Sequence, residues 1–160
     1  MRIRMRVAVS ICAMSLVMAT RGEAQQQTAT ITVPAGVAFN VTDVSVSTSG
    51  APDPTRISFS VPKSFPGNMS LMISVKADAA AFSGSGSVHP DASAVSWTAT
   101  ATTGTASAGT LGSAAYTQVF RKNNPSSGSI DLRWTLRAIA APRLRAGVHT
   151  LTMRWRIEAF

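Results

Sequence analysis

Residues that carry out chemistry are scarce in this chain. Its 160 residues include one cysteine, two histidines and seven carboxylates, whereas a catalytic site needs several such groups close together. His89 and Asp91 supply one corner of a metal site, but a tetrahedral zinc takes three or four ligands and no further cluster is visible. We therefore expect no metal and no cofactor, and we expect His89 and His149 to be ordinary surface residues.

The short motifs of common enzyme classes are missing as well. Serines are numerous, but none of them stands in a G-x-S-x-G nucleophile elbow. The sequence also has no C-x-x-C pair, no phosphate-binding loop and no dinucleotide fingerprint. The sequence therefore predicts that the protein is not an enzyme.

The first 24 residues are typical of a signal peptide. Three arginines precede an uncharged apolar run of 13 residues, 7–19, which is shorter than the roughly 20 residues that span a bilayer. The small residues Gly22 and Ala24 then provide a cleavage site. We expect residues 1–24 to be removed and residues 25–160 to be exported to the periplasm, the cell surface or the medium, without a transmembrane segment.

The exported part is basic and has no cysteine. It carries 11 lysines and arginines against 6 acids, and the single cysteine of the chain, Cys12, lies in the leader. No disulfide can form, so stability must come from packing of the core. A basic surface attracts polyanions, and an exported protein rarely meets nucleic acid. We therefore expect an anionic cell-wall or envelope polymer, and no nucleic acid, if charge selects the partner.

Alternation of apolar and polar residues is strongest near the C-terminus. Within residues 129–138 and 148–158, apolar side chains at 130, 132, 134 and 136 and at 151, 153, 155 and 157 alternate with Thr, Arg, Asp or Glu. A period of two is typical of strands with one face buried and one in water. The apolar phase of these two strands includes Trp134 and Trp155, and Trp97 has the same place in an earlier strand. We expect the three indoles in one core.

Further strands follow one another along the rest of the exported part. Turn residues fill 49–54, a bulge near Thr42 and Asp43 would explain a change of phase, and segments rich in Ser, Gly, Ala and Thr at 82–92 and 101–113 are typical of surface loops. The other expected strands are 28–33, 37–47, 56–61, 69–77, 95–100 and 116–121. Seven or eight strands without a helical period predict a single all-β domain, an antiparallel immunoglobulin-like β-sandwich.

Arginines are concentrated on the polar face of the two C-terminal strands and in the loop between them. The set is Arg133, Arg137, Arg143, Arg145, Arg154 and Arg156. If the strands pair as a hairpin about Pro142, Asp131 lies opposite Arg154 or Arg156. One interpretation is a solvated face with one or two weak cross-strand ion pairs. The other is a docking strip for an anionic envelope polymer.

The same strand pair resembles the ends of bacterial secreted surface domains. The phrase Arg145-Ala-Gly-Val-His-Thr150 before the last strand is similar to the opening of the last strand in spore-coat-U-like and fimbria-related β-sandwiches. Trp134-Thr-Leu136 and Trp155-Arg-Ile157 resemble the W-x-L pair of WxL domains. The resemblance implies a non-catalytic, surface-associated domain and adds no site residue.

Two functions follow from these expectations. The first is a structural subunit of a surface layer or appendage that joins itself or other surface proteins by strand addition at a sheet edge. Residues 28–33 would supply a detached strand that can pair within its own chain or with another chain. The second is a binding module for an envelope polysaccharide that uses the arginines and Tyr116.

Overall fold

The computed structural model describes residues 3–8, 29–62, 68–138 and 147–160, and for residues 3–8 it describes the backbone. This part of the chain is all β, apart from a single 3-10 turn at Ala92–Ala94. Ten strands form the larger of two sheets: β1 (Ile3–Ala8), β2 (Thr30–Thr32), β3 (Gly36–Val41), β4 (Thr48–Ala51), β5 (Thr55–Ser60), β7 (Ser83–Gly84), β8 (Val95–Ala101), β10 (Gly109–Thr110), β12 (Gly128–Leu136) and β13 (Val148–Thr150). The smaller sheet has four strands: β6 (Ser70–Ala77), β9 (Thr105–Ala106), β11 (Thr117–Asn123) and β14 (Met153–Ala159).

Strand β12 organises the larger sheet. One of its edges pairs with β8 along seven residues, and its other edge is shared by β5 and β4, which pair with its first and last residues respectively. The sheet continues from β4 through β3, β1 and β13 to β7. All of these pairings are antiparallel except that between β1 and β13.

Strand β1 joins two parts of the larger sheet that have no other described pairing. It is antiparallel to β3 from Ile3 opposite Val41 to Ala8 opposite Gly36, and parallel to β13, with Met5 opposite His149. This strand lies inside the segment that the sequence predicts to be a signal peptide, whose residues 9–24 are outside the described residues. The removal of residues 1–24 therefore stays a prediction.

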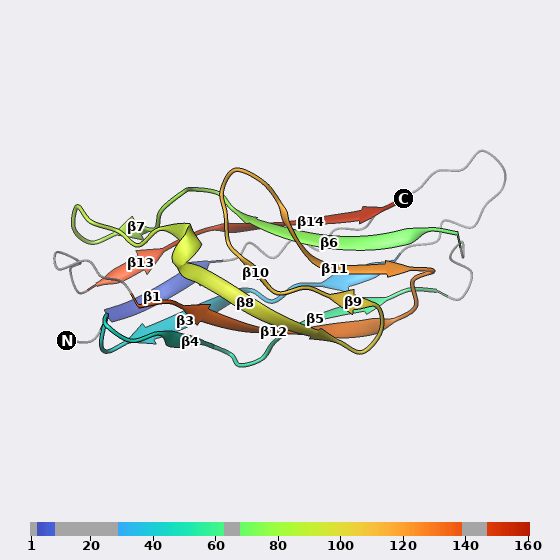
Figure 1. Ribbon diagram of the computed structural model, residues 1–160, viewed down its shortest axis with the longest axis horizontal. Helices are drawn as coiled ribbons and strands as arrows, with labels where there is room; N and C mark the ends of the chain where they lie inside the picture. Colours follow the sequence, from blue (N-terminus) through green and yellow to red (C-terminus); the bar gives the residue numbers. More distant parts are fainter. Residues whose placement is uncertain (1–2, 9–28, 63–67, 139–146) are drawn as a thin grey trace.

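The last predicted strand, 148–158, is divided between the two sheets. Its first part is β13 in the larger sheet, and after Leu151 and Thr152 the chain continues as β14, which pairs with β6 in the smaller sheet. Figure 1 shows β13 and β14 following each other end to end. The predicted hairpin between the two arginine-rich strands is therefore wrong, because β12 and β14 belong to different sheets.

The two sheets bury one common core between them. Figure 1 shows β14, β6 and β11 in one layer and β12, β5 and β3 in the other. Phe59 of β5 meets Phe120 of β11 across this interface, with ring centroids 5.1 Å apart. Such tilted aromatic pairs add to the free energy gained by burying apolar area. The antiparallel, all-β class predicted from the alternating residues is confirmed for the described residues.

The three tryptophans lie together in this core. The ring of Trp134 is 5.3 Å from that of Trp97 and 6.4 Å from that of Trp155, centroid to centroid. Trp97 and Trp134 are buried and Trp155 is half-buried against them. The prediction of a shared tryptophan core is confirmed.

Several segments predicted as turns or loops are strands. Residues 48–51 form β4, where Gly50 comes so close to Val37 and Trp134 that no side chain would fit. Within the predicted loop 101–113, Gly109 of β10 lies against the indole of Trp97. Strands that contain glycine are difficult to predict from alternation, because glycine contributes backbone hydrogen bonds but no apolar side chain to the pattern.

The bulge expected near Thr42 and Asp43 is also wrong. Strand β3 ends at Val41, and Asp43 accepts hydrogen bonds from Ser45 in a turn.

Candidate functional site

The predicted arginine strip is distributed over two separate surfaces. Arg133 and Arg137 belong to β12 and the residue that follows it in the larger sheet, whereas Arg154 and Arg156 lie on β14 of the smaller sheet. Arg143 and Arg145, together with Pro142, lie outside the described residues. The four described arginines therefore do not form one continuous strip along a hairpin.

On the larger sheet, the arginines are engaged by partners from neighbouring segments. Arg133 lies 3.2 Å from the carboxylate of Asp53, and Arg137 donates a hydrogen bond to the carbonyl oxygen of Ser93. Asp131 pairs with Arg56 across the β5–β12 ladder rather than with Arg154 or Arg156. The hydrogen bonds from Arg56 are the main cause that lowers the pKa of Asp131 below its usual value, and the charges of Arg56 and Arg133 add to this.

On the smaller sheet, the arginines of β14 also have acidic neighbours. Arg154 pairs with Asp78, and the hydrogen bond to this carboxylate is the main cause that raises the pKa of Arg154. Arg156 lies 3.2 Å from Glu158 on the same strand. All four of these side chains are at least 30% exposed, so solvent screens both pairs and each contributes little to stability.

Aromatic rings lie among the cations of the smaller sheet. The guanidinium of Arg156 is 4.5 Å from the ring centroid of Tyr116, and the ammonium of Lys76 is 5.2 Å from the same ring. At the chain end, the guanidinium of Arg121 lies 5.5 Å from the ring of Phe160, which is 56% exposed. These are cation–π distances. Tyr116 is half-buried and Phe160 is exposed, so both rings lie outside the buried core.

Strand register explains why these residues meet. Arg154 is opposite Lys76, and Arg156 and Gln118 are both opposite Ser74, so side chains from β14, β6 and β11 form rows across the outer side of the sheet. We call this surface the basic–aromatic face: Lys76, Tyr116, Arg121, Arg154, Arg156 and Phe160. Tyr116 and the two β14 arginines were among the residues predicted from the sequence. The other three were missed, because alternation gives the phase of a strand but does not identify the strands beside it.

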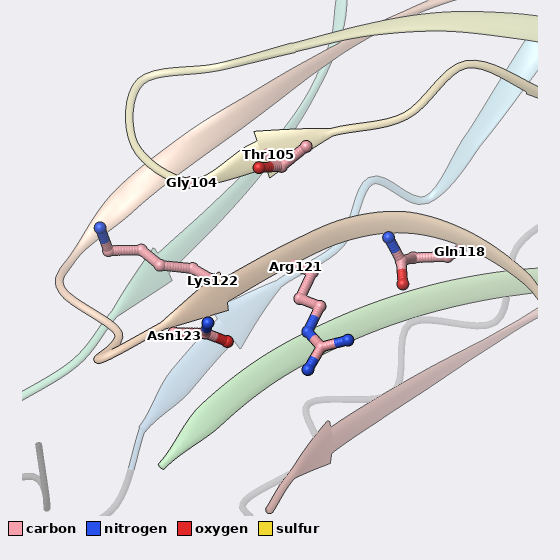
Figure 2. A pocket seen from close by; sticks show the side chains of 6 residues that line it. All are labelled: Gly104, Thr105, Gln118, Arg121, Lys122 and Asn123. Carbon is pink, nitrogen blue, oxygen red and sulfur yellow. The ribbon is translucent and has the colours of Figure 1, made fainter. Parts of the chain in front are cut away.

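A shallow pocket of about 320 Å³ adjoins the basic–aromatic face where β9 meets β11. Figure 2 shows its lining side chains, with Arg121 and Gln118 on one side of β11 and Lys122 extending in another direction. The lining residues are Gly104, Thr105, Gln118, Arg121, Lys122 and Asn123. Two cations, two amides and a hydroxyl are groups that bind carboxylate, sulfate or hydroxyl oxygens.

The prediction that both histidines are ordinary surface residues is wrong for His149. His149 is fully buried on β13, and His89 is half-buried in the loop before the 3-10 turn. Their Nδ1 atoms are 3.3 Å apart. The expectation failed because β13 is paired on both of its edges, with β1 and β7, and because His149 has the same phase as the buried Leu151 and Met153. No third His, Cys, Asp or Glu gathers around them in the described part of the chain.

Of the two pairings expected for the strand at residues 28–33, the structure shows the one within its own chain. Strand β2 is antiparallel to β5, with Ile31 opposite Phe59, and Ala29, Ile31 and Val33 are buried. This attachment is short, since it comprises three register positions.

Comparisons of the chain with protein-family models, with curated proteins and with solved structures found no match. Among the described residues, no helix has the length and apolar character needed to cross a membrane.

Proposed function

We propose that the protein is an exported, non-catalytic structural subunit of a surface layer or appendage, built on an immunoglobulin-like sandwich, that joins its neighbours by strand addition. The observation behind this proposal is the position of β1. This strand fills the gap between β3 and β13, yet it belongs to the segment predicted to be cleaved at residue 24.

Cleavage would open two strand edges at once. Along β3, six residues have register partners in β1, and without it their outward backbone groups would need new partners. The side chains of Val37, Phe39 and Val41 on β3 are buried, so an incoming strand would join a sheet that already has a formed core. An extended segment from another molecule satisfies such an edge through main-chain hydrogen bonds.

The N-terminal segment of a second copy suits this gap. After cleavage, residues 28–33 follow three glutamines and alternate polar residues with Ala29, Ile31 and Val33. In its own chain this segment makes three register pairs with β5, whereas the edge of β3 offers six positions. Exchange between copies would therefore replace a short pairing with a longer one.

Size-exclusion chromatography with light scattering tests the proposal. We expect chains that begin at Gln25 to form concentration-dependent oligomers, and chains that begin at Pro34 to stay monomeric. A peptide of residues 3–8 should suppress assembly by occupying the gap, whereas the same peptide in scrambled order should not. A chain beginning at Gln25 that is strictly monomeric at high concentration overturns the proposal.

A second candidate function is binding of an anionic envelope polysaccharide by the basic–aromatic face. The specific observation in its favour is that two cations lie within cation–π distance of Tyr116, and that Arg121 of the same face also lines a polar pocket. Aromatic rings stack on sugar rings, and cations bind the acidic substituents. Retention on purified cell wall, measured as salt is raised, tests it. Arg154→Ser with Arg156→Ser should weaken retention, and Arg133→Ser on the other sheet is the control. Absence of salt-sensitive retention rejects this candidate.

A further inference from the structure

The two histidines of the chain come from distant segments and meet side by side. His149 lies on β13, and His89 follows the glycine-rich turn after β7, the strand that pairs with β13. Their Nδ1 atoms are 3.3 Å apart, and their ring centroids are 5.5 Å apart with the planes at 69°. Because 60 residues separate them in sequence, only the folded chain places these nitrogens together.

We infer that His89 and His149 form a two-histidine binding site for a divalent transition metal such as Zn²⁺ or Cu²⁺. Nitrogens bound to one tetrahedral zinc at about 2.0–2.1 Å lie roughly 3.3–3.4 Å from each other, which is the separation found here. The same geometry places the ring centroids roughly 5 Å apart, close to the observed 5.5 Å. Imidazole nitrogen is also a preferred ligand of Zn²⁺, Cu²⁺ and Ni²⁺.

Backbone structure holds both ligands in place. His149 is fully buried, and its backbone is paired with Gly84 of β7. Gly84 has a φ of +148°, and a side chain there would collide with the backbone of Val148 and His149. The loop from this glycine carries His89 back over β13, and an isolated bridge between Ala81 and Asp91 closes its base. The ligands are therefore pre-organised, which lowers the conformational entropy lost on binding.

A metal reaches the pair from the side of the loop that carries His89, because His89 is half-buried there. In the described ranges, no third His, Cys, Asp or Glu gathers at the pair. Cu²⁺ should bind more tightly than Zn²⁺, as the usual order of metal affinities requires.

Calorimetric titration of the full chain, purified without a polyhistidine tag, with Zn²⁺ and with Cu²⁺ tests this site. We expect one metal per chain, and a rise in the unfolding temperature with metal concentration, because the metal binds the folded state. His89→Gln should weaken binding by more than about tenfold, since even loss of a residue that only orients a ligand costs 10–100-fold. In the absence of metal, this variant should unfold close to the wild-type temperature.

Two further variants complete the test. His149→Gln should also lose binding, and if this buried substitution prevents folding, His89→Gln decides alone. Asp91→Asn should bind as the wild type does, because the carboxylate is not a ligand of the pair. No stoichiometric binding, equal binding by His89→Gln, or loss of binding in Asp91→Asn overturns the inference. In the first two cases, the histidines form a hydrogen bond only.

Discussion

Asp131 on β12 lies directly opposite Arg56 on β5, and its two carboxylate oxygens accept hydrogen bonds of 2.7 and 2.8 Å from Nε and Nη2 of the arginine. This two-point contact joins strands that are 75 residues apart in sequence. It is a fork-to-fork arrangement, which gives arginine–carboxylate pairs their orientation as well as their strength.

The pH dependence of stability should report on this pair. Because Arg56 lowers the pKa of Asp131 in the folded state, the pair stabilises the fold above the unfolded pKa of about 4. This contribution is lost as the pH falls through the folded pKa. Asp131→Asn should therefore be slightly less stable than the wild type at pH 7, and the two should converge well below pH 4. Urea unfolding at several pH values measures this, and a difference that persists in acid contradicts it.

The contact between Gly109 and Trp97 should be sensitive to a single methyl group. A Cβ built at Gly109 lies 2.5 Å from Cζ2 of the indole, whereas one built at Gly112 has no atom within 4 Å. We expect Gly109→Ala to destabilise the fold by about 1–3 kcal/mol, the usual cost of overpacking, and Gly112→Ala to change it little. Equal denaturation midpoints for the two variants would show that β10 does not lie against Trp97.

Contact between the sheets should depend on Phe120. Its side chain is fully buried against Phe59, so Phe120→Ala leaves a cavity between the two layers. The expected loss is about 3–5 kcal/mol in the free energy of unfolding. Phe160→Ala is the matched control, because that ring is 56% exposed, and it should cost less than about 0.5 kcal/mol. Chemical denaturation distinguishes the two, and similar losses would contradict the assignment of Phe120 to the core.

Tryptophan fluorescence should separate the three indoles. Trp97 and Trp134 are buried, and only Trp155 is half-buried. Acrylamide should therefore quench a minor part of the emission, and Trp155→Phe should reduce that part. Full quenching of the wild-type protein would show that the indoles do not share a dry core.

Local pattern predicted much of the fold. Alternation over residues 69–77 and 129–138 located β6 and β12, because each buried face is encoded within the strand itself. Short strands such as β9 and β10 were missed because two residues hold no period. The boundary at Thr152 was also missed, because alternation continues through a strand that changes sheets.

The candidate sites depended on information that the pattern does not contain. Asp131 was expected opposite Arg154 or Arg156 but pairs with Arg56, since the choice of neighbouring strand is decided by distant packing. His149 was expected at the surface but is buried, because the pattern does not show which segments pack over a strand. Lys76 was expected to point outward, whereas the phase of the strand that ends at Arg121 was ambiguous. Only the register of three strands places these two cations beside Tyr116 and Phe160.

The division of the C-terminal segment has a consequence for the completion of both sheets. Residues 148–150 contribute to one layer and residues 153–159 to the other, so a single short stretch ties both layers together. On one edge of β6, seven backbone positions are paired with that final stretch, while β11 pairs with the other edge. The smaller sheet is therefore complete only when residues 153–159 are in place, and their placement also fixes residues 148–150 in the larger sheet.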